Sequence, residues 1–225
     1  FSFKGTTLHP RYGNPLPRIA ECPGGLLNAV GLQNPGIEHV MQHELIELKE
    51  YYKKPVIANI SGFSIEEYTA CCAMVDKADN VGIIEVNVSC PNVANLSCLQ
   101  NKEHLKKLLE GLIDFRRGQN HYRPILLKIS PDLSDEQIDE MIEVLVENGL
   151  DGIVATNTTT SRQGLLTPSD LVAEIGNGGL SGGPLTDRSL EMVRYIHKKT
   201  EGRFPIIGVG GIMTEDDAVA MLDAG

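Results

Sequence analysis

The sequence lacks any cluster of lysine or arginine residues. Its 30 acidic side chains outnumber the 20 basic ones, which gives a formal net charge of -10. Proteins that bind nucleic acid backbones need a basic face, so this charge balance argues against a nucleic acid partner. An anionic small molecule would have to be held by a few local cations.

Long apolar runs are also missing, because no stretch approaches the roughly 20 apolar residues that a membrane-spanning helix needs. Residues 1–5 do not have the charged-then-apolar layout of a signal peptide. We therefore expect no transmembrane segment and a cytoplasmic protein, with peripheral association with a membrane as the open alternative. The chain begins without Met in a strand-like segment and stops at Gly225 directly after a helical pattern, so both ends look cut.

The spacing that marks a metal site is absent from both the cysteines and the six histidines, so we predict no bound metal. The odd number of cysteines favours reduced thiols in a cytosolic compartment. Two adjacent cysteines fall in a helical pattern and are expected in the core. The cysteines are Cys22, Cys71, Cys72, Cys90 and Cys98.

Short, β-rich apolar runs alternate with helical patterns along the chain. The apolar runs span 55–60, 82–88, 124–129, 152–157 and 205–209, and the helical patterns span 37–52, 64–79, 102–117, 134–148, 185–199 and 214–223. Near-continuous apolar runs are typical of parallel strands that are covered on both faces. Ser64 and Ser134 each stand three residues ahead of Glu or Gln, which predicts capping boxes at two helix starts.

Strict β-then-α order gives either a doubly wound sheet or a (β/α)8 barrel. We favour an α/β fold of the TIM-barrel type, because polar residues fall at the carboxyl end of nearly every strand. With residues 1–4 as a strand there are six β/α units, so the first and last of the eight units of a closed barrel are expected to be missing. We predict one incomplete domain over 1–225, with a hairpin in the insertion 6–32 acting as a lid over the barrel mouth.

Cys90 follows the apolar run 82–88 directly, within Asn87-Val-Ser-Cys-Pro-Asn92. The carboxyl ends of parallel strands open onto the ligand site, so a thiol placed there can move a proton. The alternative is a packed small hydrophobe, since free cysteine is among the most buried residue types. Pro91 and the two asparagines favour a functional thiol, because proline ends the strand and carboxamides are costly to bury without a partner.

Gly208-Val-Gly-Gly211 ends a strand and precedes a helix, which is typical of a backbone-amide cradle for phosphate. A tight turn is the alternative explanation. A second glycine cluster, 176–183, also precedes a helix, and two such loops strengthen the prediction of a phosphorylated cofactor.

Lysine and asparagine side chains at strand ends predict a polar ligand. Lys128 interrupts an apolar run, and buried lysine needs a partner, although Lys4 could simply reach the surface. A cation beside the pyrimidine ring of a flavin would stabilise its anionic reduced form. Asparagines can together bind an imide-like ring, because each offers one acceptor and two donors, but in loops they more often form turns. The asparagines in question are Asn28, Asn87, Asn92 and Asn157.

Several ordered motifs resemble the dihydroorotate dehydrogenase family over nearly the whole chain. They are Lys4-Gly-Thr-Thr7, Arg11-Tyr-Gly-Asn-Pro-Leu-Pro-Arg18, Asn28-Ala-Val-Gly-Leu-Gln-Asn-Pro-Gly36, Asn87-Val-Ser-Cys-Pro-Asn92, Lys128-Ile-Ser-Pro-Asp132, Thr156-Asn-Thr-Thr159, Gly178-Gly-Leu-Ser-Gly182 and Ile206-Ile-Gly-Val-Gly-Gly211. The first 93 residues, which include Cys90, resemble the soluble class with a cysteine base, whereas the part from Asn95 onward is more similar to the membrane-associated, quinone-dependent class. The electron acceptor therefore stays open between fumarate, a quinone, and NAD reached through a partner subunit.

The resemblance implies an FMN-dependent oxidation of (S)-dihydroorotate to orotate in UMP biosynthesis, with Cys90 as the base, and either a homodimer or an electron-transfer partner subunit. The implied substrate residues are Lys4, Asn28, Gly31, Leu32, Asn87, Asn92 and Asn157. The implied FMN residues are Lys4, Asn59, Asn87, Lys128, Gly182, Gly210 and Gly211. Two alternatives remain: a pyrimidine-reducing flavin domain like that of dihydropyrimidine dehydrogenase, and a non-catalytic phosphate-binding barrel fragment.

Overall fold

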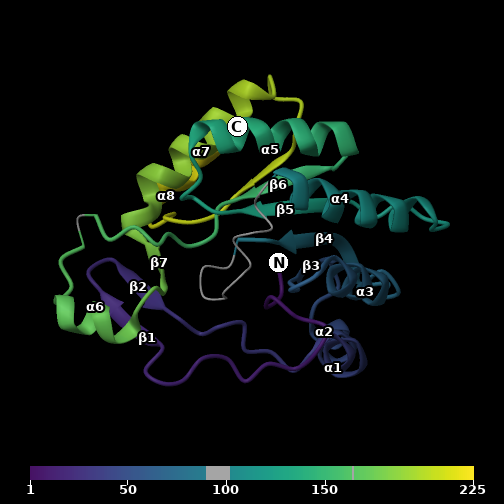
Figure 1. The fold of residues 1–225 in the computed structure, drawn as a ribbon, viewed down its shortest axis with the longest axis horizontal. Helices are drawn as coiled ribbons and strands as arrows, with labels where there is room; N and C mark the ends of the chain where they lie inside the picture. The colour runs from purple at the N-terminus through teal and green to yellow at the C-terminus, as the bar shows by residue number, and fades with distance from the viewer. Residues whose placement is uncertain (90–101, 164) are drawn as a thin grey trace.

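The computed structural model describes residues 1–89, 102–163 and 165–225, and these form two sheets with surrounding helices (Figure 1). The larger sheet is parallel, with strand order β3-β4-β5-β6-β8, and the smaller one is antiparallel, with order β1-β2-β7. The parallel strands are β3 Val56–Ile60, β4 Val81–Asn87, β5 Ile125–Ile129, β6 Gly152–Ala155 and β8 Ile206–Gly208. The antiparallel strands are β1 Ile19–Cys22, β2 Gly25–Asn28 and β7 Gly179–Gly182.

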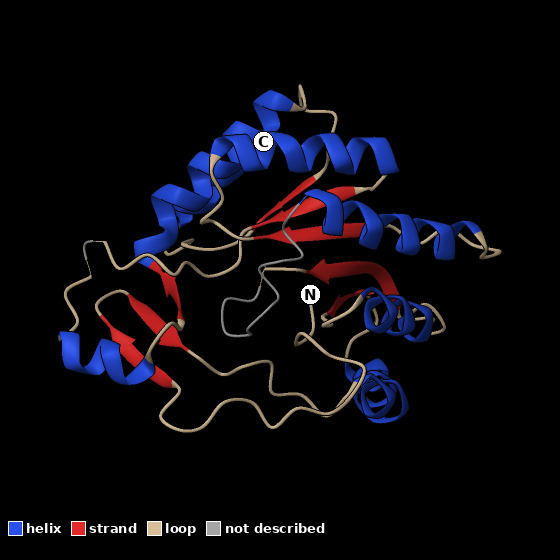
Figure 2. Ribbon diagram, viewed as in Figure 1, coloured by secondary structure: helices blue, strands red, loops and turns tan. Residues whose placement is uncertain are grey.

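The helices alternate with the parallel strands and cover the outer face of the curved sheet, except α6, which packs against β1 and β2 (Figure 2). They are α1 Ile37–His39, the π-helical turn η1 Val40–Glu44, α2 Leu45–Tyr51, α3 Ile65–Val75, α4 Lys102–Arg117, α5 Asp135–Asn148, α6 Ser169–Ile175, the 3-10 turn η3 Gly183–Leu185, α7 Thr186–Lys199 and α8 Glu215–Asp223. Neighbours α3, α4, α5, α7 and α8 pack in chain order. Consecutive parallel strands with an outer helix layer confirm the predicted α/β barrel type, and the described strands leave the barrel open.

The segment 1–6 runs parallel to β3 and occupies the place of the first predicted strand. Isolated bridges join Ser2 to Ile57 and Thr6 to Ile60, and the amide of Phe3 donates to the carbonyl of Ile57 at 3.1 Å. These bonds hold Lys4 beside the carboxyl end of β3, although the segment is bridged rather than a continuous strand.

The pleat of the parallel sheet separates an apolar outer face from a polar inner face. Successive side chains point to opposite faces, and residues paired across parallel strands share a face. The outward residues join the helices in the main core, as Ile84, Val86 and Leu127 do. The intervening positions on three strands carry Asn59, Glu85, Asn87 and Lys128. The polar residues that interrupt the apolar runs therefore lie together inside the barrel.

The predicted helix starts are largely confirmed. Ser134 and Gln137 form a reciprocal capping box at the start of α5. At α3 only half of the predicted box exists, because Ser64 Oγ accepts from the Glu67 amide at 3.3 Å while the Glu67 carboxylate accepts from the Phe63 amide at 2.7 Å. The Glu67 carboxylate therefore accepts from the amide of Phe63, the residue before Ser64, and not from the amide of Ser64 itself.

The hairpin predicted within residues 6–32 is present as β1 and β2. The sequence analysis missed its third strand, because β7 lies about 150 residues later and pairs with β2 in antiparallel register, Gly25 opposite Gly182. It also missed α6, which closes a small second core with Ala20, Leu27 and Leu180. A role for this unit as a lid stays a prediction.

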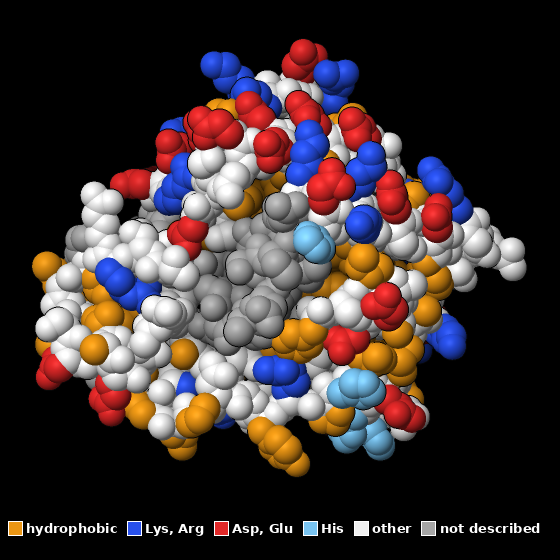
Figure 3. All heavy atoms as spheres, in the orientation of Figure 1, with side chains coloured by type: hydrophobic (Ala, Val, Ile, Leu, Met, Phe, Trp, Pro, Cys, Tyr) orange, Lys and Arg blue, Asp and Glu red, His pale blue; other side chains and the backbone are white. Residues whose placement is uncertain are grey.

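Charged side chains of both signs are mixed over α4 and α5 on the face shown in Figure 3. Within the described ranges, no helix has the length and apolarity that crossing a bilayer requires. Both observations concern only residues 1–89, 102–163 and 165–225.

Cys71 and Cys72 should be chemically silent in the folded protein. Both are fully buried in α3, and burial raises the pKa of each thiol to about 12. Alkylation needs the thiolate, and at a pH near 8 almost all of both side chains is in the thiol form. We expect iodoacetamide followed by peptide mass mapping to label half-buried Cys22 in the native protein and the pair only after denaturation. Rapid native labelling of the pair would contradict their burial.

Candidate functional site

A cavity of about 340 Å³ opens where the carboxyl ends of the parallel strands meet the segment 1–5 and the chain after β2. Eight of the residues predicted from the sequence line it: Lys4, Asn28, Gly31, Leu32, Asn59, Asn87, Lys128 and Asn157. Ser2, Phe3, Gly5, Val30 and Thr158 complete the lining. Residues that are far apart in the chain therefore meet at one polar cavity, as strand-end placement predicts.

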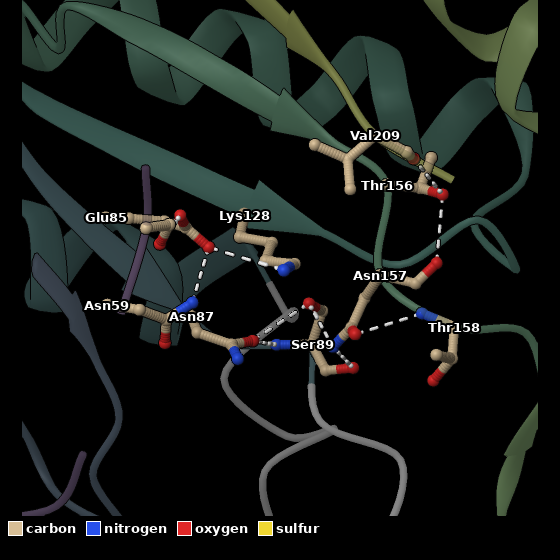
Figure 4. Close-up of polar contacts among 10 residues, drawn as sticks. Asn59, Glu85, Asn87, Ser89, Lys128, Thr156, Asn157, Thr158 and Val209 are labelled. Carbon is tan, nitrogen blue, oxygen red and sulfur yellow. Dashed lines mark hydrogen bonds and ion pairs between the residues drawn. The ribbon is translucent and has the colours of Figure 1, made fainter. Parts of the chain in front are cut away.

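Asn87 at the end of β4 is held in one orientation. Its Oδ1 accepts from the Ser89 amide at 3.1 Å and from Ser89 Oγ at 3.0 Å (Figure 4). The hydroxyl of fully buried Tyr68 donates to the Asn87 carbonyl at 2.7 Å. Among the described residues nothing accepts from the side-chain NH2 of Asn87, so this group can donate to a ligand in the cavity.

Asn157 ties the end of β6 to the end of β4. Its Nδ2 donates to the Ser89 carbonyl at 2.9 Å and to Ser89 Oγ at 3.0 Å, and its Oδ1 accepts from the Thr158 amide at 2.9 Å. Both ends of this carboxamide are already bonded (Figure 4). Asn157 lines the cavity, and the second lone pair of its Oδ1 is the part of the carboxamide that is left to accept a hydrogen bond.

Lys128 has a buried counter-charge that the sequence analysis missed. Its Nζ lies 3.4 Å from Oε1 of Glu85, whose side chain is 3% exposed. Asn59 Nδ2 donates to the same Glu85 oxygen at 2.5 Å (Figure 4). Ser2 Oγ donates to Oε2 of Glu85 at 3.0 Å. The signal was present, because Glu85 interrupts an apolar run just as Lys128 does.

The predicted phosphate cradle at Gly210 and Gly211 lies beside the end of β6, where the amides of Thr156 and Val209 cross-bond to the neighbouring strand. The carbonyl of Gly210 accepts from Ser189 Oγ at 2.7 Å, and that of Gly211 accepts from Thr186 Oγ1 at 2.5 Å. In the described part of the chain no acceptor is bonded to either glycine amide. With φ of +112° and +70°, both positions favour glycine.

The remaining predicted residues are placed differently. Gly182 lies in β7 opposite Gly25 and outside the 340 Å³ cavity lining. Asn28 lines the cavity and also donates to the Gly179 carbonyl at 3.5 Å. Cys90 and Asn92 lie outside the described residues.

A larger cavity of about 660 Å³ lies between Pro131, Thr159 and the start of α7. Two of its charged side chains are hydrogen-bonded within the protein. Arg188 donates to the carbonyls of Pro131 and Leu133 at 2.8 and 2.7 Å, and Asp132 accepts from the amide and hydroxyl of Thr160 at 2.7 Å each. We take the smaller cavity as the candidate active site, because it is lined by eight of the predicted residues and by the unbonded side-chain NH2 of Asn87.

Comparison with known proteins shows a family. The family model described as dihydroorotate dehydrogenase matches residues 1–225. The chain is 36% identical over 225 residues to the dihydroorotate dehydrogenase B (NAD(+)) catalytic subunit of Cutibacterium acnes, covering 99% of this chain and 70% of that protein. It is 39% identical to the subunit of the same name from Enterococcus faecalis strain V583, covering 99% of this chain and 69% of that protein.

Among solved structures, the crystal structure of a ligand-free DHODH from Eimeria tenella superposes with a TM-score of 0.90 at 26% identity. The superposition covers 100% of this chain and 68% of that one.

The hydrogen bond from the Tyr68 hydroxyl to the backbone carbonyl of Asn87 should stabilise the end of β4. Replacing Tyr68 with Phe removes the hydroxyl that donates to the Asn87 carbonyl, so the buried carbonyl oxygen loses this hydrogen bond. We expect Tyr68→Phe to lower the free energy of unfolding by about 1 kcal/mol in urea titrations. Tyr51→Phe, at a side chain that is 78% exposed, is the matched control and should change nothing measurable. Equal stability of the two variants would show that the Tyr68 bond does not hold the strand end.

Proposed function

This chain belongs to the dihydroorotate dehydrogenase family, and on that premise we propose that the 340 Å³ cavity is where it oxidises dihydroorotate to orotate in pyrimidine biosynthesis. The observation that carries the proposal is convergence: eight predicted ligand residues, from segments spread between Lys4 and Asn157, line a single cavity. Polar residues placed at strand ends without a common ligand would be spread along the edge of the sheet instead of meeting at one cavity.

The residues present fit a flavin, and we propose FMN. Lys128 brings an ammonium group to the cavity, and Asn59 and Asn87 bring carboxamides, which suit the carbonyl and imide edge of the ring. The Asn59 Oδ1 atom is buried and lacks a partner among the described residues, so it can accept from a ring N–H. The unbonded amides of Gly210 and Gly211 suit the phosphate. Gly182 stays a prediction as an FMN residue. Bound flavin supplies the hydride acceptor.

We assign the substrate to the same cavity. The ring of dihydroorotate offers amide N–H groups and carbonyls, which the NH2 of Asn87 and the carboxamides of Asn28 and Asn157 complement. Lys4 supplies positive charge for the substrate carboxylate, and Gly31 with Leu32 forms the adjoining wall. By the family motif, Asn92 would add a further carboxamide.

Cys90 is the proposed base. It follows Ser89, which the structure holds between Asn87 and Asn157 at the cavity. A thiolate would take the proton from C5 of dihydroorotate as the hydride leaves C6. A cation such as Lys4 would lower the pKa of the thiol enough for it to act near neutral pH.

We propose NAD as the final acceptor, reached through a partner subunit. The relatives from Cutibacterium acnes and Enterococcus faecalis are each named a catalytic subunit of an NAD(+) enzyme. Such a name implies a second subunit that carries electrons away.

Anaerobic mixing tests the activity. Purified protein loaded with FMN should lose its visible flavin absorbance when dihydroorotate is added, and NAD should restore the colour only with a partner subunit present. Dihydrouracil serves as the comparison substrate, since it can give up a hydride as dihydroorotate does but lacks the carboxylate that Lys4 would bind. Bleaching that occurs with a reduced pyrimidine but never with dihydroorotate would assign the pyrimidine-reducing activity instead.

Replacing Cys90 with Ser should slow flavin reduction by dihydroorotate about a hundredfold or more near neutral pH, the typical contribution of a general base. Serine is a far weaker base than a thiolate, while FMN should stay bound. Stopped-flow absorbance measures the rate. Cys22→Ser, the same chemical change at a half-buried residue of β1, should leave it unchanged. Equal rates in both variants would remove Cys90 from the reaction.

A further inference from the structure

Glu85 lies behind the cavity wall rather than in it. It is 2% exposed and is absent from the cavity lining, whereas its partners Asn59 and Lys128 both line the cavity. Oε1 of Glu85 receives the Asn59 carboxamide at 2.5 Å and faces Lys128 Nζ at 3.4 Å, and Oε2 receives Ser2 Oγ at 3.0 Å. Glu85 therefore contacts the groups that would meet a ligand.

The strand register explains this arrangement. Glu85 is opposite Asn59 across β3 and β4, and Asn87 is opposite Lys128 across β4 and β5. Glu85 and Asn87 are two residues apart and share the inner face. The Lys128 side chain reaches back toward Glu85, and this carboxylate oxygen is its only bonding partner in the described part of the chain. An ammonium group has three donors, so the cation keeps capacity for a ligand.

The negative charge of Glu85 affects the electrostatics of the cavity as well as its structure. A buried carboxylate is costly unless it is paired and hydrogen-bonded, and here one ammonium, one carboxamide and one hydroxyl satisfy it. In this low-dielectric setting its negative charge also acts on whatever ligand lies against Lys128.

We propose that Glu85 is a positioning residue that sets both the place and the effective charge of Lys128, and thereby holds the reduction potential of the bound flavin below the value that an uncompensated Lys128 would give. This inference rests on the proposed flavin function. Reduction adds negative charge to the ring, which Lys128 favours and Glu85 opposes. Removing the charge of Glu85 while keeping its shape should make the flavin easier to reduce.

Glu85→Gln is the direct test. A glutamine can still accept from Asn59 and can donate to Ser2 Oγ, so the variant removes the charge with little change in shape. We expect the midpoint potential of bound FMN, measured by equilibration with a reference dye, to shift to a more positive value. FMN titration of the apoprotein, followed by fluorescence quenching, gives a second readout.

Two controls separate charge from structure. Glu85→Asp keeps the charge with a shorter side chain and should leave the potential close to that of the parent. Glu143→Gln makes the same change in net charge at a surface residue whose carboxylate pairs with Lys102 at 2.9 Å, and should not shift the potential.

The outcomes are distinct. A positive shift in Glu85→Gln alone supports the inference, as does loss of FMN binding in Glu85→Gln with retention in Glu85→Asp. An unchanged potential in Glu85→Gln, or equal loss of FMN from both Glu85 variants, overturns it. A parent protein that binds no FMN would instead refute the proposed function itself, before any variant is compared.

Discussion

Parallel pairing of β3, β4, β5, β6 and β8 is the constraint on which the site depends. It brings the carboxyl ends of these strands to one edge, while the pleat directs alternate side chains inward. Asn59, Glu85, Asn87 and Lys128 become neighbours only because the register sets Asn59 against Glu85 and Asn87 against Lys128. A slip of one residue would turn each of these polar side chains into the apolar helix interface.

The charged side chains of the cavity then favour an anionic ligand. The chain as a whole carries a net charge of -10, so an anionic ligand is drawn in only where cations are concentrated. Lys4 and Lys128 both line the cavity, and Glu85 balances part of that charge from behind. Asn87, whose Oδ1 is held by Ser89, supplies a directional donor beside these charges. Such a cavity suits a planar, carbonyl-rich ring better than an apolar molecule.

Much of this arrangement could be predicted from the sequence, because the signals were local. Apolar runs and capping serines placed the parallel strands and their helices, and polar residues at strand ends predicted the cavity lining. Pairing of β7 with β2 could not be predicted, because Gly182 and Gly25 meet across more than 150 residues with no local pattern. Bonds within the site were equally inaccessible: Asn157 looked like a free ligand residue, yet its carboxamide is tied to Ser89.

The central claim is that one cavity holds flavin and substrate in contact. Titration of the oxidised, FMN-loaded protein with orotate tests it most directly, because orotate cannot reduce the flavin and reports only on proximity. The account predicts a saturable change in the visible flavin spectrum as orotate fills the cavity. Orotate that binds by calorimetry while the flavin spectrum stays unchanged would place the two ligands apart and contradict the account.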